Sequence, residues 1–149
     1  MAVRRSLTFA RMDEIMPEVD RLLAGHTMVG NWGLAQMCNH LSNSIQMSIE
    51  GFDIKLPWLL RATIGRIAKR EIFSKGVMRS GIKLPKKFLP ANGLDDRAEA
   101  EALRAAIGYY FTNPTPRAPH PMLGKLSGPE WDRLHCIHSA HHLSFALQD

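Results

Sequence analysis

The stretch WDRLHCIHSAHHLSFAL, residues 131–147, carries four histidines within eight positions. We expect it to form an α-helix, in which each residue advances about 100° around the axis, so that His138 and His142 lie one turn apart on the same face. Two imidazoles at this spacing are a common way for one helix to supply two ligands of a transition-metal ion. A chain that uses such a pair must fold so that a further ligand from elsewhere reaches the same face.

A second segment offers that further ligand. Residues 31–51 repeat apolar side chains at helical spacing, which predicts a helix with Asn31 as its N-cap. His40 flanks the apolar stripe of this helix. A lone histidine in such a place is more often a packed core residue than a ligand, so its role depends on whether it meets His138 and His142.

Three other histidines leave the assignment open. His135 lies one turn before His138, and His141 lies three residues after it, so either could replace a ligand or act beside the metal. His141 is also a candidate proton carrier, because a free histidine has a pKa of about 6.5. His120, in a proline-rich stretch, is either a surface residue of a rigid loop or an acid or base near the site. We therefore take His141 and His120 as the candidate catalytic residues.

The remaining helix signals define the fold class. An apolar stripe predicts a helix over 13–24, and the capping-box pattern D-x-x-E at 96–99 predicts a helix that ends in the aromatic residues 109–111, which we expect in the core. A second box, S-x-x-E at 127–130, predicts the start of the last helix. Four helices, one with two histidines and another with one, indicate an all-α four-helix bundle with a polar site between facing helices.

The chain between the second and third of these helices has a different character. PWLLRATIGRIAKREIF (57–73) predicts an extra amphipathic helix, which we expect to pack over the bundle as a lid. The following SKGVMRSGIKLPKKFLPANG (74–93) is broken by glycines and prolines, which predicts a long loop. Long loops inside a compact domain are often functional, and we expect this one to cover the mouth of a pocket.

Positive charge is concentrated in the same region. Residues 55–87 contain ten Lys or Arg and a single acid, a charge of +9, whereas the rest of the chain carries −4. We interpret this basic segment as a solvated helix face. The alternative is that it binds an anionic membrane or polymer.

Length and composition limit the remaining possibilities. The 149 residues suit a single domain, 1–149, and no apolar run approaches the roughly 20 residues of a membrane span. No secretory signal is visible at the N-terminus, and the two cysteines, Cys38 and Cys136, suit a reducing cytoplasm and positions in the core. Nothing resembles a nucleic-acid-binding module, so we expect no nucleic-acid partner.

The histidine segments resemble a known superfamily. His40 in MCNHLSNSI, together with IHSAHHLSFAL, resembles the two metal-binding signatures of the DinB-like (YfiT-like) four-helix bundles, over about Leu7 to Leu147. HPMLGKLSGPEWDRLHCIHSAHHLSF is similar to a branch catalogued as a domain of unknown function. The resemblance implies up-up-down-down topology, often a homodimer, and a divalent metal, commonly zinc or nickel, bound by His40, His138 and His142.

The same resemblance implies a function. Members with assigned activity include thiol-dependent transferases and isomerases, so the chain is expected to be a metal-dependent hydrolase or thiol transferase that acts on a small molecule. Many relatives continue after the last ligand with Arg-Gly-Gln, where this chain has LSF at 143–145, so a thiol cofactor carries over less directly. The alternative is a non-catalytic bundle whose metal site is structural or vestigial and which serves as a binding module.

Overall fold

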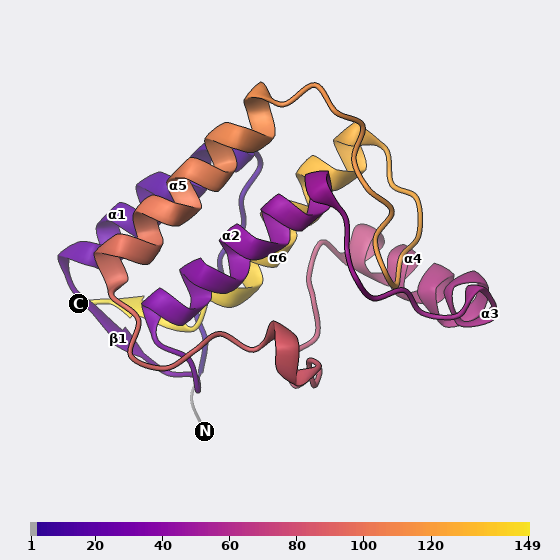
Figure 1. Cartoon of the computed structure of the whole chain (residues 1–149). Helices are drawn as coiled ribbons and strands as arrows, with labels where there is room; N and C mark the ends of the chain where they lie inside the picture. Colours follow the sequence, from indigo (N-terminus) through magenta and orange to yellow (C-terminus); the bar gives the residue numbers. More distant parts are fainter. Residues whose placement is uncertain (1–2) are drawn as a thin grey trace.

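A computed structural model describes residues 3–149 and shows a mostly helical chain (Figure 1). The five main helices are α1 (Ile15–Ala24), α2 (Leu34–Glu50), α4 (Arg66–Lys75), α5 (Asp96–Thr112) and α6 (Gly128–Leu143). The shorter elements are the 3-10 turns η1 (Met12–Glu14) and η3 (Lys86–Phe88), the single turn α3 (Trp58–Leu60), the π-helix η2 (Arg61–Gly65), and the strands β1 (His26–Met28) and β2 (Ala146–Gln148).

Four of the helices share one apolar core. α2 packs against α5 and α6, and α1 also packs against α5 and α6. Each helix contributes apolar residues three and four positions apart, which form one stripe facing the others. The fully buried members include Ile15, Leu22, Leu34, Leu41, Ile45, Leu103 and Leu143. The four helices predicted from these stripes are therefore present.

The start of α2 differs from the prediction. Its N-cap is Gly33 rather than Asn31. The Asp96 carboxylate, at the first position of α5, accepts a hydrogen bond of 2.8 Å from the Ala35 backbone N–H. A carboxylate at a helix N-terminus satisfies a free N–H and is favoured by the helix dipole. A tertiary contact thus replaces the local cap that the sequence suggested.

The ends of α5 also correct the prediction. The side chain of Asp95 caps this helix by accepting a 2.8 Å hydrogen bond from the Ala98 N–H, one residue before the cap we expected. At the other end only Tyr110 is buried, whereas Tyr109 and Phe111 are exposed. Three consecutive residues of a helix point in different directions, so they cannot all face one core.

The last helix begins as predicted but ends earlier. Ser127 and Glu130 form the expected capping box. The helix stops at Leu143 instead of continuing to Leu147, and β2 follows, pairing antiparallel with β1 so that Met28 lies opposite Ala146. The chain is therefore not all-α. Strands of three residues are too short to show an alternating pattern in the sequence.

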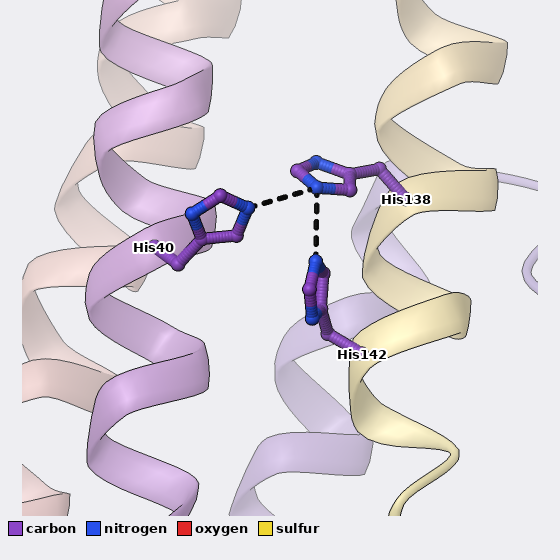
Figure 2. A group of neighbouring side chains, drawn as sticks. All are labelled: His40, His138 and His142. Carbon is purple, nitrogen blue, oxygen red and sulfur yellow. Dashed lines mark hydrogen bonds between the residues drawn. The ribbon is translucent and has the colours of Figure 1, made fainter. Parts of the chain in front are cut away.

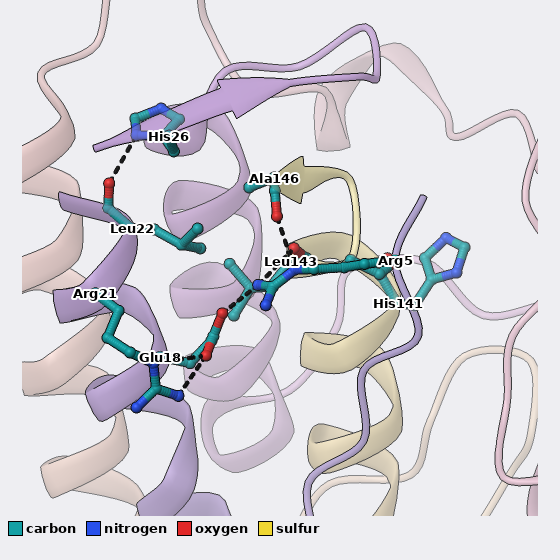
Figure 3. A network of polar contacts seen from close by, with 9 residues as sticks. Arg5, Glu18, Arg21, Leu22, His26, His141, Leu143 and Ala146 are labelled. Carbon is teal, nitrogen blue, oxygen red and sulfur yellow. Dashed lines mark hydrogen bonds and ion pairs between the residues drawn. The ribbon is translucent and has the colours of Figure 1, made fainter. Parts of the chain in front are cut away.

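The N-terminal segment ties the end of α6 to α1. The Arg5 backbone N–H donates to the Ser144 carbonyl at 3.0 Å, and its side chain donates to the Ala146 carbonyl at 2.8 Å. Figure 3 shows the Arg5 guanidinium continuing to the buried Glu18 carboxylate, which Arg21 also contacts. Burial raises the pKa of Glu18, but the two guanidinium groups outweigh burial and hold it below its ordinary value.

The predicted amphipathic helix is present as α3, η2 and α4, which we call the basic arm (Trp58–Lys75). It extends away from the other helices and does not form a lid (Figure 1). Gly65 and Ile72 are its buried residues. A Cβ atom at Gly65 would overlap the Met122 carbonyl oxygen, so glycine at this position allows the arm to dock against the 118–124 loop. Among the described residues, no helix combines the length and apolarity needed to cross a membrane.

We predict that Gly65→Ala lowers the free energy of unfolding by about 1–3 kcal/mol, because the added methyl group must displace backbone. Gly108→Ala is the matched control, since Gly108 is also helical but has no atom within 4 Å of the added Cβ. The control should be neutral or stabilising by up to about 1 kcal/mol. Urea denaturation measures both, and equal effects of the two substitutions would contradict the docking contact.

We also predict that Glu18→Gln lowers the free energy of unfolding by about 1.5–3 kcal/mol at neutral pH, because the partly buried Arg5 guanidinium loses the carboxylate that it binds. Asp13→Asn removes the partner of Arg11 in an exposed ion pair and should have no measurable effect. Chemical denaturation compares the two variants. A Glu18→Gln variant as stable as Asp13→Asn would show that the Arg5 link does not hold the termini together.

Candidate metal site

The structure brings His40 of α2 together with His138 and His142 of α6 (Figure 2). The Nε2 atom of His138 lies 3.1 Å from that of His40 and 3.1 Å from that of His142. One ligand nitrogen from each residue lies within 4.8 Å of the other two. His40 is buried, and the other two are half-buried. The candidate ligands predicted from the sequence therefore converge on one point.

The spacing of these nitrogens suits a shared ion better than hydrogen bonds alone. A neutral imidazole nitrogen carries either one hydrogen or one lone pair, so His138 Nε2 cannot form two full hydrogen bonds at once. Two nitrogens bound to one zinc ion at about 2.0–2.1 Å with tetrahedral angles are about 3.3 Å apart. The observed 3.1 Å contacts are close to that value. The three residues could thus hold a divalent metal ion.

Burial keeps the three rings neutral. It lowers the pKa of His40 to about 4. For His142, burial together with nearby His40 and His141 lowers the pKa to about 2. Burial and the two partner rings hold the pKa of His138 well below its ordinary value. The neutral imidazole is the form that binds metal, so no proton has to leave before an ion binds near neutral pH.

Trp32 covers two of the rings and was not expected from the sequence. Its indole stacks parallel to His142 at a centroid distance of 5.3 Å and lies tilted against His40 at 5.2 Å. Trp32 precedes α2 in a short irregular segment, so no helical periodicity points to it. The contact restricts the orientation of both imidazoles.

The three histidines line a cavity of about 740 Å³. One side is formed by the 78–84 segment and Leu89, so the long loop lines a pocket. Arg79 and Lys83 are cationic residues of this loop. The apolar lining residues are Val29, Trp32, Met37, Met78, Ile82, Leu84, Leu89 and Phe145. A small molecule could reach the histidines within this space.

His141 also lines the cavity, but it does not belong to the three-histidine group. Its ring contacts His142 edge-on at a centroid distance of 5.0 Å. Its Nδ1 accepts a 2.9 Å hydrogen bond from Arg4, because a guanidinium can only donate. Nε2 therefore carries the hydrogen of the neutral ring. Burial and the charge of Arg4 lower the pKa of His141.

His135 lies away from the group and does not replace a ligand. Its Nε2 lies 3.1 Å from the Ser48 hydroxyl, which itself donates to the Ile45 carbonyl at 2.6 Å. His135 is therefore the donor in the first of these bonds. Its ring stacks on Trp131 at 5.2 Å. The residue is a satisfied core histidine.

His120 does not line the cavity either. Its Nδ1 accepts hydrogen bonds from the backbone N–H groups of Met122 and Leu123, at 3.1 and 3.0 Å. Its ring packs against Phe52 and Trp131. These contacts stabilise the turn that supports the basic arm.

Both cysteines are buried core residues, as predicted. Burial raises the pKa of Cys38 to about 12 and that of Cys136 to about 11. A thiolate is the form that binds metal, so neither thiol is prepared for that role.

We predict that the metal-free protein loses stability as the pH falls below about 6.5. Burial lowers the pKa of His120 to about 4, and burial with nearby His120 and Arg117 lowers that of His135 to about 3. Both values return to about 6.5 in the unfolded chain, so the unfolded state binds more protons in this window. Stability is fully present above pH 6.5 and is lost toward pH 4, at up to about 1.4 kcal/mol per pH unit for each histidine.

Urea denaturation in the presence of a chelator, repeated over this pH range, measures how steeply the free energy of unfolding changes with pH. His135→Leu should make this pH dependence shallower by the contribution of one histidine. The comparison holds whatever the substitution does to stability at neutral pH. An unchanged pH dependence would show that His135 takes up a proton to the same extent in the folded and the unfolded protein, which would contradict the prediction.

Comparisons with known proteins place the chain in a family. No curated protein and no solved structure matches it. A family model described as "Protein of unknown function (DUF1569)" matches residues 1–149. Because the match covers the whole printed sequence, the chain belongs to the DUF1569 family.

Proposed function

We propose that His40, His138 and His142 bind a divalent metal ion, zinc or nickel, and that the protein uses it to act on a small molecule. The observation that carries this proposal is the convergence of three neutral imidazole nitrogens on the wall of a cavity. Neutral imidazole suits both metals. Within the described part of the chain no carboxylate joins the group, so an ion would keep positions open for water or substrate.

We also propose that the fold is a DinB-like (YfiT-like) bundle with up-up-down-down topology, formed by residues 1–149 as one domain. Two features support this. α1 and α2 each pack against α5 and α6, and the basic arm with its long loop separates the two pairs in the sequence. The candidate ligands also come from the second and the last helix of the bundle, as the superfamily resemblance implies. That resemblance further suggests a homodimer.

The proposed reaction is hydrolysis or thiol transfer. A divalent ion at this site would supply a Lewis acid that acidifies a bound water or holds a substrate thiolate. The chain's own residues provide the surroundings: apolar side chains line the cavity, and Trp32 lies against His142. His141, which lines the cavity beside His142 and accepts a hydrogen bond from Arg4 at Nδ1, is the candidate proton carrier. His120 takes no part in this proposal, because its Nδ1 is occupied by backbone N–H groups outside the cavity.

The second candidate function is a non-catalytic binding module with a structural metal site. The close cover of His142 by Trp32 favours it, because structural sites are closed. A structural site predicts a large drop in melting temperature on chelation and no turnover of ester or thiol substrates. A catalytic site predicts turnover that chelation abolishes.

We predict about one zinc or nickel ion per chain in protein purified without a histidine tag, measured by elemental mass spectrometry. Each of His40→Ala, His138→Ala and His142→Ala should lose the ion, because two imidazoles hold a metal far less tightly than three. His141→Ala is the matched control: it removes a histidine of the same helix and cavity from outside the group, and it should retain the ion.

Circular dichroism establishes that each variant remains folded. Metal retained by the folded triple variant at His40, His138 and His142 would contradict the assignment. Loss of metal in His141→Ala, with metal retained in the other variants, would show that His141 is the ligand, an alternative that the sequence left open.

A further inference from the structure

The basic arm exposes large apolar side chains to solvent. Trp58 is 72%, Leu59 59%, Ile64 58% and Ile67 68% exposed. Ile64 and Ile67 are three residues apart, so they are neighbours on the helix surface. A group of large apolar side chains exposed to solvent commonly marks an interaction site.

The same arm carries cations that are not neutralised within the described chain. Arg66 and Arg70 are exposed, lie one turn apart, and form no ion pair with any described residue. Of the ten cations in residues 55–87, those with acidic partners are Lys69 with Glu130, Lys75 and Arg79 with Glu71, and Lys87 with Asp53. The arm therefore presents apolar and unpaired cationic side chains together.

The body of the protein holds the arm in place without covering these residues. Gly65 lies directly against the Met122 carbonyl, and Lys69 pairs with Glu130 at 2.8 Å. The Arg133 guanidinium lies over the Phe73 ring, 5.6 Å from its centroid. Because the helix is already formed, binding through its exposed face requires little ordering of the chain. Figure 1 shows α3 at the far end of the arm, away from the other helices.

The positive charge of the basic arm distinguishes between two possible partners for its exposed face, a second copy of the chain and a lipid surface. A second copy of the chain in a two-fold dimer would place one basic arm against another, so like charges would meet. An anionic lipid surface matches both properties, since acyl chains accept the apolar residues and the phosphates accept the cations. Tryptophan is also favoured at the boundary between headgroups and acyl chains.

We propose that the basic arm binds the surface of an anionic lipid bilayer. Trp58, Leu59, Ile64 and Ile67 enter the headgroup region, and Arg66 and Arg70 contact lipid phosphates. The arm then lies along the membrane surface and does not cross it. This inference does not depend on the metal site, because no residue of the arm lines the cavity.

Co-sedimentation of the full chain with vesicles tests the proposal. Vesicles of phosphatidylcholine with about one third phosphatidylserine should bind the protein, whereas phosphatidylcholine alone should not. Binding should weaken as salt is added, because screening reduces the attraction of the cations. Equal binding to both vesicles, or none to either, would overturn the proposal.

Two pairs of variants locate the surface. Arg66→Gln with Arg70→Gln should lower the partition coefficient roughly 25-fold, since each cation near the surface contributes about fivefold. Arg97→Gln, at an exposed arginine of α5, should leave it unchanged. Trp58→Ser with Ile67→Ser should also weaken binding, whereas Phe111→Ser, at a 58% exposed residue of α5, should not.

Effects of the same size in the control variants would overturn the assignment to the arm. So would sedimentation velocity showing a dimer that Trp58→Ser with Ile67→Ser dissociates, because the apolar face would then bind a second copy. Vesicle binding lost only in the arginine variant would show that charge alone attracts the protein and that the apolar residues do not enter the headgroup region, which would likewise contradict the proposal.

Discussion

The packing of α6 against α2 is the contact on which the candidate site depends, because it joins one histidine to two from a different helix. A rotation of α6 by one residue would turn His138 and His142 away from His40 by about 100°. The capping box at Ser127 fixes one end of α6. At the other end, β2 pairs with β1 and Arg5 binds the Ala146 carbonyl. The capping box sets where α6 begins, and the contacts at its C-terminal end restrict its rotation relative to α2.

Burial gives the histidine group its chemical character. Withdrawal from water keeps the imidazoles neutral, and this leaves their nitrogens free to bind an ion near neutral pH. Neutral ligands do not offset the charge of a divalent ion, so the ion would remain a strong Lewis acid. The protein encloses this group between Trp32 and the loop at 78–84. The basic arm lies outside that enclosure, and its exposed face is separate from the cavity.

Local patterns predicted the helices and the histidine group, because both depend on short-range spacing. The apolar stripes of α1, α2, α5 and α6 follow directly from helical periodicity, and the i, i+4 spacing places His138 beside His142. Features set by contacts between distant residues were missed. Asp96 completes the start of α2 from another helix, and Trp32 reaches the site from an irregular segment.

The basic arm is a second feature that the sequence pattern predicted only in part. Its amphipathic pattern correctly predicted a helix but suggested that the apolar face was buried. The close approach of Gly65 to the Met122 carbonyl fixes the arm in an orientation that leaves Ile64 and Ile67 in solvent. Periodicity identifies an apolar face, whereas only the tertiary contacts determine what that face meets.

X-ray absorption spectroscopy at the metal edge of the zinc- or nickel-loaded protein tests the central claim most directly. The three-histidine site predicts a first shell of nitrogen or oxygen at about 2.0–2.1 Å, with the multiple scattering of three imidazoles for each ion. His138→Ala should remove this signal. A sulfur shell at about 2.3 Å would indicate ligation by Cys38 or Cys136, and it would contradict the account, as would fewer than three imidazoles around the ion.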